Sequence, residues 1–169
     1  KRGIANHAQP HVDANYLLKL DFKDFFPSIL GTDFLGHLRR HIADISHVDA
    51  QRVVNVLFRK DKTTGRLRLS IGAPSSPAVS NTILFEFDTR LEDACRTLGV
   101  VYTRYADDLA FSTNIPRVLD NVLVIVNRIC SDITYPRLIL NEEKTVFTSR
   151  KHLRELTGLI LTPDKKLSI

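Results

Sequence analysis

Two aspartates stand side by side in "YTRYADDLAFST" (residues 102–113), a stretch otherwise rich in the β-branched and aromatic residues typical of strands. Successive side chains of a strand point to opposite faces, so Asp107 and Asp108 can serve one site only if the chain reverses there. Aspartate tolerates the backbone angles of a tight turn, and we therefore predict a hairpin with this pair at its tip. An Asp-Asp pair is also an ordinary turn sequence, so the pair alone does not establish a metal site.

A third acid, Asp21, ends a predicted strand at residues 15–22, "NYLLKLDF". If that strand lies beside the hairpin, three carboxylates meet at one edge of a sheet. They repel one another unless a cation lies between them, and hard divalent cations prefer such oxygen ligands. Two Mg²⁺ ions roughly 3.5–4 Å apart can activate an attacking hydroxyl and stabilise a leaving phosphate oxygen. The set predicts phosphoryl or nucleotidyl transfer, without distinguishing synthesis from hydrolysis of a phosphodiester.

Helical periodicity and strand composition predict the elements that position these acids. Helices are expected over residues 32–45, 47–60, 75–98 and 116–133, and strands over 137–149 and 156–162. Thr32 is the expected N-cap of the first helix, and Ser75 or Ser76 of the third. Strands separated by helices, with a hairpin at the centre, predict an α+β fold: an antiparallel sheet with helices packed on one face.

Composition favours a globular domain with a polyanionic partner. The chain has 169 residues, 43% apolar, and its 24 Lys and Arg against 19 Asp and Glu give a formal charge of +5. Basic residues gather in "RKDKTTGRLR" (residues 59–68) and "SRKHLR" (residues 149–154), which favours contact with a phosphate backbone. Cys95 and Cys130 are far apart and are expected to be reduced core thiols.

Targeting signals are not evident. No apolar run is long enough to span a bilayer and no signal-peptide pattern opens the chain, so we expect no membrane partner and a cytoplasmic location. The first residue is not methionine and the last follows directly on a predicted strand, so we also expect a fragment of a longer polypeptide.

Four segments together resemble the successive palm motifs of a reverse transcriptase, in order and in spacing. They are "LKLDFKDFFPSI", "GAPSSPAVSN", "YTRYADDLAFS", and "NEEKTVF" followed by "LTGLIL". The chain is similar to the bacterial retron type, with defence-associated reverse transcriptases as near relatives. The resemblance implies a polymerase palm over residues 1–169, with part of the fingers between about 32 and 70, and with the upstream fingers and downstream thumb absent.

The resemblance implies an RNA-directed DNA polymerase that uses two Mg²⁺ ions, for which Mn²⁺ can substitute. Asp21, Asp107 and Asp108 are then the catalytic metal ligands, with the backbone carbonyl of Phe22 as a further ligand. Lys144 matches a lysine that protonates or stabilises departing pyrophosphate. A lysine on a strand edge is ordinarily just solvated, and that alternative stays open.

The implied nucleotide site uses residues of the first two motifs. Phe26 matches a bulky ring that excludes a nucleotide 2′-hydroxyl, although Phe25 and Phe26 can equally be core residues. Gly72, Ala73 and Pro74 match a backbone segment that approaches the nucleotide and template closely. The implied partners are an RNA template, a DNA or RNA primer, deoxynucleoside triphosphates and, in the retron type, a dedicated structured RNA.

The implied nucleic-acid contacts are Arg104, Thr157 and Gly158. Arg104 contacts primer or template backbone, or else pairs with an acid. Thr157 and Gly158 resemble the turn that grips the primer end, or else belong to an ordinary core strand.

The sequence departs from the family pattern at three places. Ile71 stands where the family often has a glutamine that contacts the incoming nucleotide, and an apolar side chain cannot supply that hydrogen bond. "HAQPH" replaces Asn-Ala-x-x-His upstream, and "LTG" replaces Val-Thr-Gly near the end. His7 and His11 are not expected to bind a metal, because Pro10 breaks the helix that would align them. These departures and the missing regions leave one alternative, a weak or silent palm that acts as a nucleic-acid-binding scaffold in a defence system.

Overall fold

The computed structural model describes residues 3–162, 164 and 166–168, and these form two compact units. The first contains the described residues up to Lys23, Phe87–Asp132, and those from Ile139 onward. The second contains Asp24–Glu86 and Ile133–Leu138. Among the described residues, no helix combines the length and the apolar character needed to cross a membrane.

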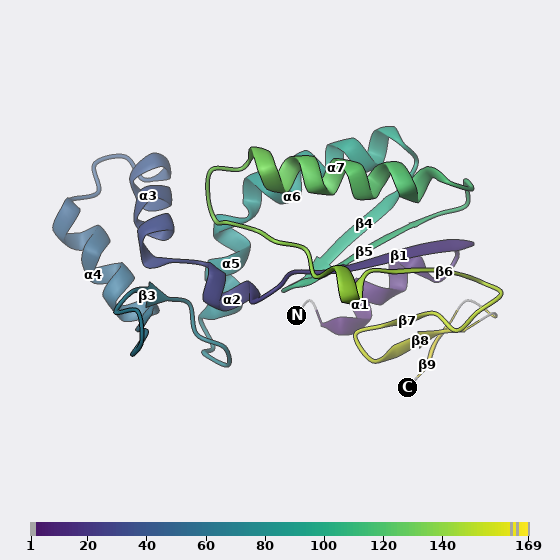
Figure 1. Ribbon diagram of the computed structural model, residues 1–169, viewed down its shortest axis with the longest axis horizontal. Helices are drawn as coiled ribbons and strands as arrows, with labels where there is room; N and C mark the ends of the chain where they lie inside the picture. Colours follow the sequence, from purple (N-terminus) through teal and green to yellow (C-terminus); the bar gives the residue numbers. More distant parts are fainter. Residues whose placement is uncertain (1–2, 163, 165, 169) are drawn as a thin grey trace. The chain divides into compact units, whose positions relative to one another are not determined.

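A four-stranded antiparallel sheet forms the centre of the first unit (Figure 1). Its strands, in the spatial order β4-β5-β1-β6, are β4 (Val101–Tyr105), β5 (Asp108–Thr113), β1 (Tyr16–Asp21) and β6 (Val146–Ser149). Strands β4 and β5 form the predicted hairpin, and β1 lies directly beside β5. The apolar residues Leu17, Leu18 and Leu20 of β1 are at most 1% exposed, so β1 is a central strand covered on both faces.

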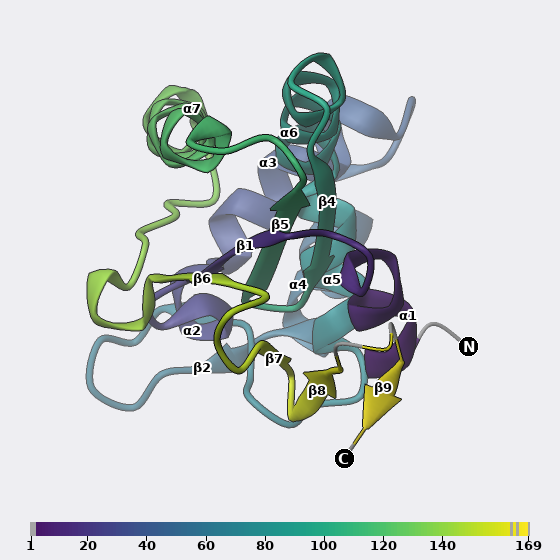
Figure 2. The same cartoon turned by 90° about the vertical axis from the view of Figure 1, so that its right-hand side faces the viewer.

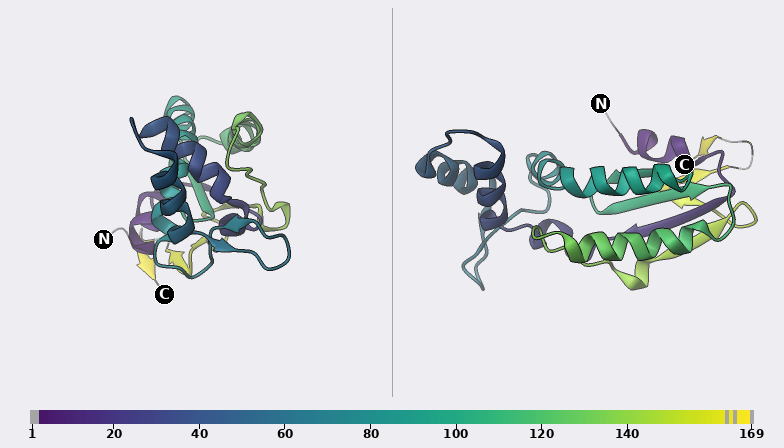
Figure 3. Two further views of the ribbon diagram at one scale, coloured as in Figure 1. Left: turned by 90° about the vertical axis from the view of Figure 1, so that its left-hand side faces the viewer. Right: turned by 90° about the horizontal axis from the view of Figure 1, so that it is seen from above.

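Two long helices cover one face of this sheet. Helix α6 (Phe85–Thr97) buries Phe87, Leu91 and Cys95, and helix α7 (Val118–Asp132) buries a stripe of four apolar residues. Seen from above, the two helices lie side by side along the strands (Figure 3). The predicted α+β fold, with helices on one face of an antiparallel sheet, is confirmed.

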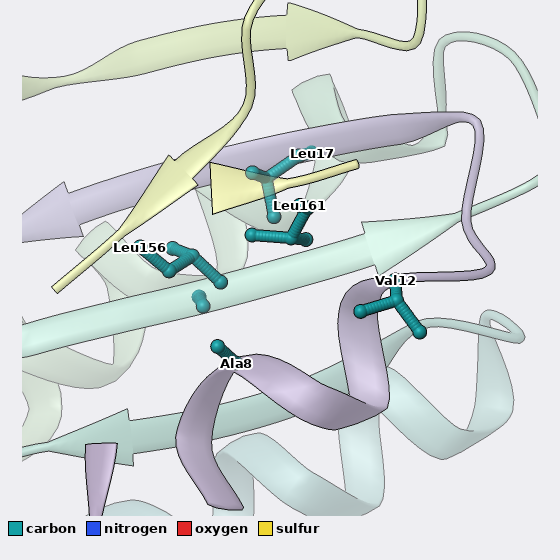
Figure 4. Packing of buried hydrophobic residues seen from close by; sticks show 6 residues of the cluster. Ala8, Val12, Leu17, Leu156 and Leu161 are labelled. Atoms are coloured by element: carbon teal, nitrogen blue, oxygen red, sulfur yellow. The ribbon is translucent and has the colours of Figure 1, made fainter. Parts of the chain in front are cut away.

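The opposite face carries a cover that the sequence did not predict (Figure 2). It consists of the short helices α1 (Ile4–Ala8) and η1 (Gln9–His11) and a second sheet of β7 (Glu155–Leu156), β8 (Leu159–Leu161) and β9 (Leu167–Ser168). Figure 4 shows how these parts interlock: side chains from α1 and β7–β8 pack against the sheet. The buried cluster comprises Ala8, Val12, Leu17, Ala110, Leu156 and Leu161.

The second unit is built mainly from helices. They are α2 (Phe25–Ser28), α3 (Gly31–His41), α4 (His47–Leu57) and α5 (Ser76–Ile83), with a small hairpin of β2 (Arg59–Lys60) and β3 (Leu67–Arg68). Gly31 lets α3 approach its neighbours closely, because a Cβ there would lie 2.8 Å from Val54 Cγ1 and 2.9 Å from Leu67 Cβ. Ser46 caps α4 by accepting a hydrogen bond from the Asp49 amide.

Three local predictions were wrong. Thr32 is not a cap, because α3 begins one residue earlier and the Asp33 carboxylate accepts from the Leu30 amide. Ser75 makes no side-chain cap bond. The hydroxyl of Ser76 instead donates to the Ser70 carbonyl at 2.6 Å. The single helix predicted over residues 75–98 is two helices, since Leu84 has a ψ of 5° and interrupts it.

The two cysteines are free thiols, as predicted, but only Cys95 is fully in the core; Cys130 is half-buried. One of the two basic groups is also partly internal. Arg154 is 2% exposed and donates to the Ala14 carbonyl, and Arg150 donates to the Asp13 carbonyl. The group at residues 149–154 therefore offers fewer cations to a partner than its sequence suggested. The group at residues 59–68 forms the β2–β3 hairpin, where both residues of β2 are exposed.

Candidate active site

Strand pairing brings the three predicted carboxylates to one edge of the central sheet. Asp21, the last residue of β1, lies directly opposite Asp108, the first residue of β5. The chain reverses at Ala106 and Asp107, with Ala106 in the left-handed region at a φ of 55°. The Phe22 amide donates to the Asp107 carbonyl at 3.2 Å, which ties the tip of the hairpin to the end of β1.

The acids at this edge carry more negative charge than their surroundings balance. Burial raises the pKa of Asp108, and the charges of Asp107 and Asp21 raise it further. Burial and the charge of Asp21 likewise raise the pKa of Asp107. Two cations act on these acids: the charge of Lys19 opposes the rise in the pKa of Asp108, and Lys144 Nζ donates to Asp21 Oδ2 at 3.0 Å. This hydrogen bond and the charge of Asp21 raise the pKa of Lys144, which keeps it protonated.

Lys144 lies in η2 (Glu142–Lys144), a 3-10 turn just before β6, rather than on the strand itself. The segment leading to it is held to β1, because the Asn141 amide donates to the Asp21 carbonyl at 2.8 Å. Lys144 is therefore not simply a solvated lysine, because its ammonium pairs with Asp21 at the carboxylate edge. Of its side chain, 60% remains exposed.

The three acids suit a hard divalent cation in the kind of donor they offer. Within the described residues, no three carboxylate, imidazole or thiol groups converge closely enough to enclose a metal ion by themselves. In the arrangement seen here, one oxygen of Asp21 is bonded to Lys144. An ion that is held by Asp21 would have to compete with that ammonium.

The adjacent Phe22 packs its ring edge-on against Phe87 of α6, with 5.6 Å between the ring centroids. The residue is 2% exposed, so its side chain belongs to the core. In the second unit, Phe25 is the core residue of its pair at 3% exposure, whereas Phe26 is half-buried with its ring against that of Phe25. The sequence left open which phenylalanine is internal, and the structure assigns that place to Phe25.

The segment of Gly72, Ala73 and Pro74 runs along the surface of the second unit just before α5. Gly72 has a φ of 82°, and the space where its Cβ would lie is open. Neighbouring Ile71 is 76% exposed, which is unusual for so large an apolar side chain. This backbone is thus accessible at Gly72, and its approach to a nucleotide stays a prediction.

Thr157 and Gly158 form the two-residue turn between β7 and β8, both with positive φ. The flanking Leu156 is 2% exposed and belongs to the buried cluster of the second face. The leucine of "LTG" is therefore a core residue, and the turn beyond it is accessible at Gly158; a primer contact by this turn stays a prediction.

Arg104 has the second of the two roles considered for it. Its guanidinium holds the Asp88 carboxylate with two hydrogen bonds, at 2.8 Å and 2.6 Å, and only 5% of the side chain is exposed. The Tyr102 hydroxyl donates to the same carboxylate at 2.8 Å. Sequence reasoning missed Asp88 and Tyr102. The available signal was the spacing of Tyr102 and Arg104, which places both on one face of β4.

His7 and His11 belong to a buried polar cluster and not to a metal site. The two nitrogens of His11 lie 2.7 Å from the hydroxyls of Ser112 and Thr103, and the Thr103 hydroxyl also lies 2.7 Å from His7 Nδ1. Burial lowers the pKa of His7 to about 4 and that of His11 to about 3, so both rings are neutral.

Comparison with known proteins decides the family. Residues 1–161 match the family described as reverse transcriptase (RNA-dependent DNA polymerase). The chain belongs to the reverse transcriptase family. Proteins of this family generally use divalent metal ions, in keeping with the carboxylate edge.

Curated relatives point to the retron branch. The chain is 37% identical over 170 residues to the retron Ec83 reverse transcriptase of Escherichia coli, covering 99% of this chain and 54% of that protein. It is 31% identical to the retron Ec86 reverse transcriptase of Escherichia coli, covering 97% of this chain and 48% of that protein. It is 32% identical to the retron Mx65 reverse transcriptase of Myxococcus xanthus, covering 99% and 41%. The chain thus spans about half the length of these relatives.

Solved structures support the fold. A telomerase from Candida tropicalis matches with a TM-score of 0.58 at 16% identity, covering 94% of this chain and 36% of that one. A telomerase from Candida albicans in complex with a fragment of telomeric RNA matches with a TM-score of 0.59 at 14% identity, covering 97% and 32%.

Proposed function

We propose that this chain provides the catalytic core of a retron-type RNA-directed DNA polymerase, which adds deoxynucleotides to a primer 3′-hydroxyl. The observation that carries the proposal is the pairing of Asp21 opposite Asp108, with Asp107 at the adjoining turn and Lys144 beside them. The family membership and the retron relatives support the same activity.

In this proposal Asp21, Asp107, Asp108 and the Phe22 carbonyl hold two Mg²⁺ ions, for which Mn²⁺ can substitute. When bound, such ions lower the pKa of the primer hydroxyl and balance charge on the transferred phosphate. Lys144 carries a proton that it donates to the departing pyrophosphate. The ammonium form, which has the proton to donate, is present at neutral pH.

The remaining site residues are proposed to bind nucleotide and primer. Phe26 is half-buried with its ring partly accessible, as a group that excludes a 2′-hydroxyl must be. The open backbone of Gly72, Ala73 and Pro74 can approach the nucleotide, and the turn of Thr157 and Gly158 can contact the primer end. Arg104 is not included among the nucleic-acid contacts, since its guanidinium is engaged with Asp88.

Residues 1–169 are proposed to form a polymerase palm, with part of the fingers between about residues 32 and 70. An RNA template, a DNA or RNA primer, deoxynucleoside triphosphates and a dedicated structured RNA are the proposed partners, in the cytoplasm. The exposed basic hairpin β2–β3 supports a polyanionic partner, since cations on one hairpin can follow a phosphate backbone.

Primer extension by the protein at its natural length tests the proposal. RNA template, primer and Mg²⁺ are supplied with deoxynucleotides or ribonucleotides in separate reactions. We expect incorporation of deoxynucleotides only, and a loss of at least about 10³-fold in Asp107→Asn, because that variant removes one charged ligand from the site. Asn keeps the size of the side chain, so the variant should fold normally.

Full activity of Asp107→Asn would contradict the assignment of the site. If the protein binds nucleic acid but incorporates nothing on any template, the silent scaffold replaces the polymerase. Equal use of ribonucleotides would remove Phe26 from its role.

A further inference from the structure

Both peptide groups that flank Asp107 are held by hydrogen bonds. The carbonyl of Asp107 itself, which belongs to the peptide group after it, accepts from the Phe22 amide at 3.2 Å. The carbonyl before it, that of Ala106, accepts from Arg104 Nη1 at 2.9 Å. Because the orientation of these two peptide planes sets φ and ψ of Asp107, the two bonds fix the direction in which its carboxylate leaves the backbone.

The turn needs such support. Ala106 has a φ of 55°, in a region that costs a residue with a Cβ roughly 1–2 kcal/mol. Conformations of this kind persist where the surrounding structure determines them from several sides. Here the guanidinium of Arg104 and the amide of Phe22 act on neighbouring peptides of the same turn.

Arg104 is itself fixed by an anchor on helix α6. Asp88 accepts from Nε and Nη2 of the guanidinium, in the fork geometry that only arginine can satisfy. Tyr102 donates to the same carboxylate, and burial raises the pKa of Tyr102 well above its ordinary value, so its hydroxyl keeps the proton it donates. The third guanidinium nitrogen, Nη1, is then in position to donate to the Ala106 carbonyl.

We propose that Arg104, anchored by Asp88, is a positioning residue that sets the orientation of Asp107 in the proposed polymerase site. The inference rests on the proposed function for its catalytic consequence, but its structural content can be measured without any activity. It also replaces the direct contact with primer or template that the sequence had suggested for Arg104.

Hydrogen exchange at the hairpin, combined with kinetics, tests this role in the protein at its natural length. The variants are Arg104→Lys, which keeps a charge near Asp88 but cannot reach both Asp88 and Ala106, and Arg104→Met, which removes every bond. The matched controls are Arg90→Lys and Arg90→Met. Arg90 also extends from α6 to an aspartate, Asp132, at 2.9 Å, but this pair joins α6 to α7 and not to the hairpin.

We expect faster amide exchange over residues 105–108 in both Arg104 variants, by about tenfold or more, and unchanged exchange there in both Arg90 variants. We also expect kcat to fall by on the order of 10²-fold, because displacement of a reacting group by about 1 Å has that effect. KM for primer and template should stay within about threefold of the unsubstituted protein. Arg104→Lys keeps the ion pair, so it should remain folded even if Arg104→Met does not.

Two results would overturn the inference. One is unchanged exchange at the hairpin in folded Arg104→Lys or Arg104→Met. The other is a raised KM with a weaker salt dependence and an unaltered kcat, which is the behaviour of a phosphate contact. If the unsubstituted protein synthesises no DNA but the Arg104 variants still loosen the hairpin, the polymerase proposal fails while the positioning of Asp107 by Arg104 stands.

Discussion

The tip of the β4–β5 hairpin, with Asp107 and Asp108, differs from its body, with Thr103 and Ser112, in how the polar side chains are paired. At the tip, Asp107 and Asp108 lie with Asp21 near the ammonium groups of Lys144 and Lys19, and burial together with repulsion between the acids still raises the pKa of both hairpin acids. In the body, Thr103 and Ser112 meet the neutral ring of His11 at 2.7 Å on each side. In the body, both hydroxyls and both nitrogens of His11 have hydrogen-bond partners, whereas at the tip carboxylates are in excess.

This difference in pairing distinguishes the groups that stabilise the fold, in the body, from the groups available to bind a ligand, at the tip. A buried polar network with its partners in place holds strands and covering helix together. Carboxylates held near one another lower the stability of the apo protein, and a bound cation would reverse that effect. The tip is therefore the part of this sheet whose residues are explained by function and not by stability.

Acid is expected to act first on the body of the hairpin. The pKa of His7 is lowered to about 4 and that of His11 to about 3, from an ordinary 6.5. The unfolded chain therefore binds more protons than the folded one below pH 6.5. The contribution of the two rings is complete above pH 6.5 and is lost as pH falls toward 4 for His7 and toward 3 for His11. We expect the free energy of unfolding to drop by several kcal/mol between about pH 7 and pH 4.

Urea unfolding at a series of pH values measures this drop, and His11→Gln isolates one ring. Glutamine still offers an amide to the two hydroxyls but does not titrate. Its free energy of unfolding should depend on pH less steeply, by about one proton. An identical slope in the variant and the unsubstituted protein would show that His11 does not titrate in this range.

Removing the His11 ring altogether is the next largest effect. His11→Ala leaves the Ser112 hydroxyl, which is fully buried, without its partner. We expect a loss of about 2–4 kcal/mol at neutral pH, from the unpaired hydroxyl and the cavity together. Asp107→Asn, at the tip of the same hairpin, should keep or raise stability, since the raised pKa of Asp107 means that its ionised form is disfavoured in the fold. Equal losses in the two variants would erase the contrast between body and tip.

Local chemistry in the sequence sufficed to place the tip. β-branched and aromatic residues on both sides of two aspartates predicted the hairpin, and the strand ending at Asp21 predicted the third acid. That β1 lies beside β5 depends on pairing between distant segments, which the sequence pattern allowed but did not determine. The structure supplied that adjacency.

Pairings between side chains on separate helices and strands could not be predicted from the sequence. Nothing in the pattern of α6 marks Asp88 as the partner of Arg104, because an acid on a helix face is ordinarily solvated. The break at Leu84 was missed for a related reason. It has neither proline nor glycine as a signal, and its residue is fully buried, so packing sets the local geometry.

Substitution of Lys144 is the test with the smallest expected effect at the tip. It is discriminating because the loss of the ammonium should strengthen Mn²⁺ binding but slow DNA synthesis. Its hydrogen bond to Asp21 competes with a metal ion, so Lys144→Met should bind Mn²⁺ up to about fivefold more tightly, a modest change because the lysine side chain is 60% exposed. If the same ammonium protonates pyrophosphate, kcat for DNA synthesis should fall by on the order of 10²-fold. Mn²⁺ affinity can be read from the relaxation of water protons, independently of synthesis.

Lys19→Met is the matched control, since Lys19 acts on Asp108 only through its charge and should change Mn²⁺ affinity less. Weaker Mn²⁺ binding in Lys144→Met would mean that the lysine organises the carboxylates and does not compete for them.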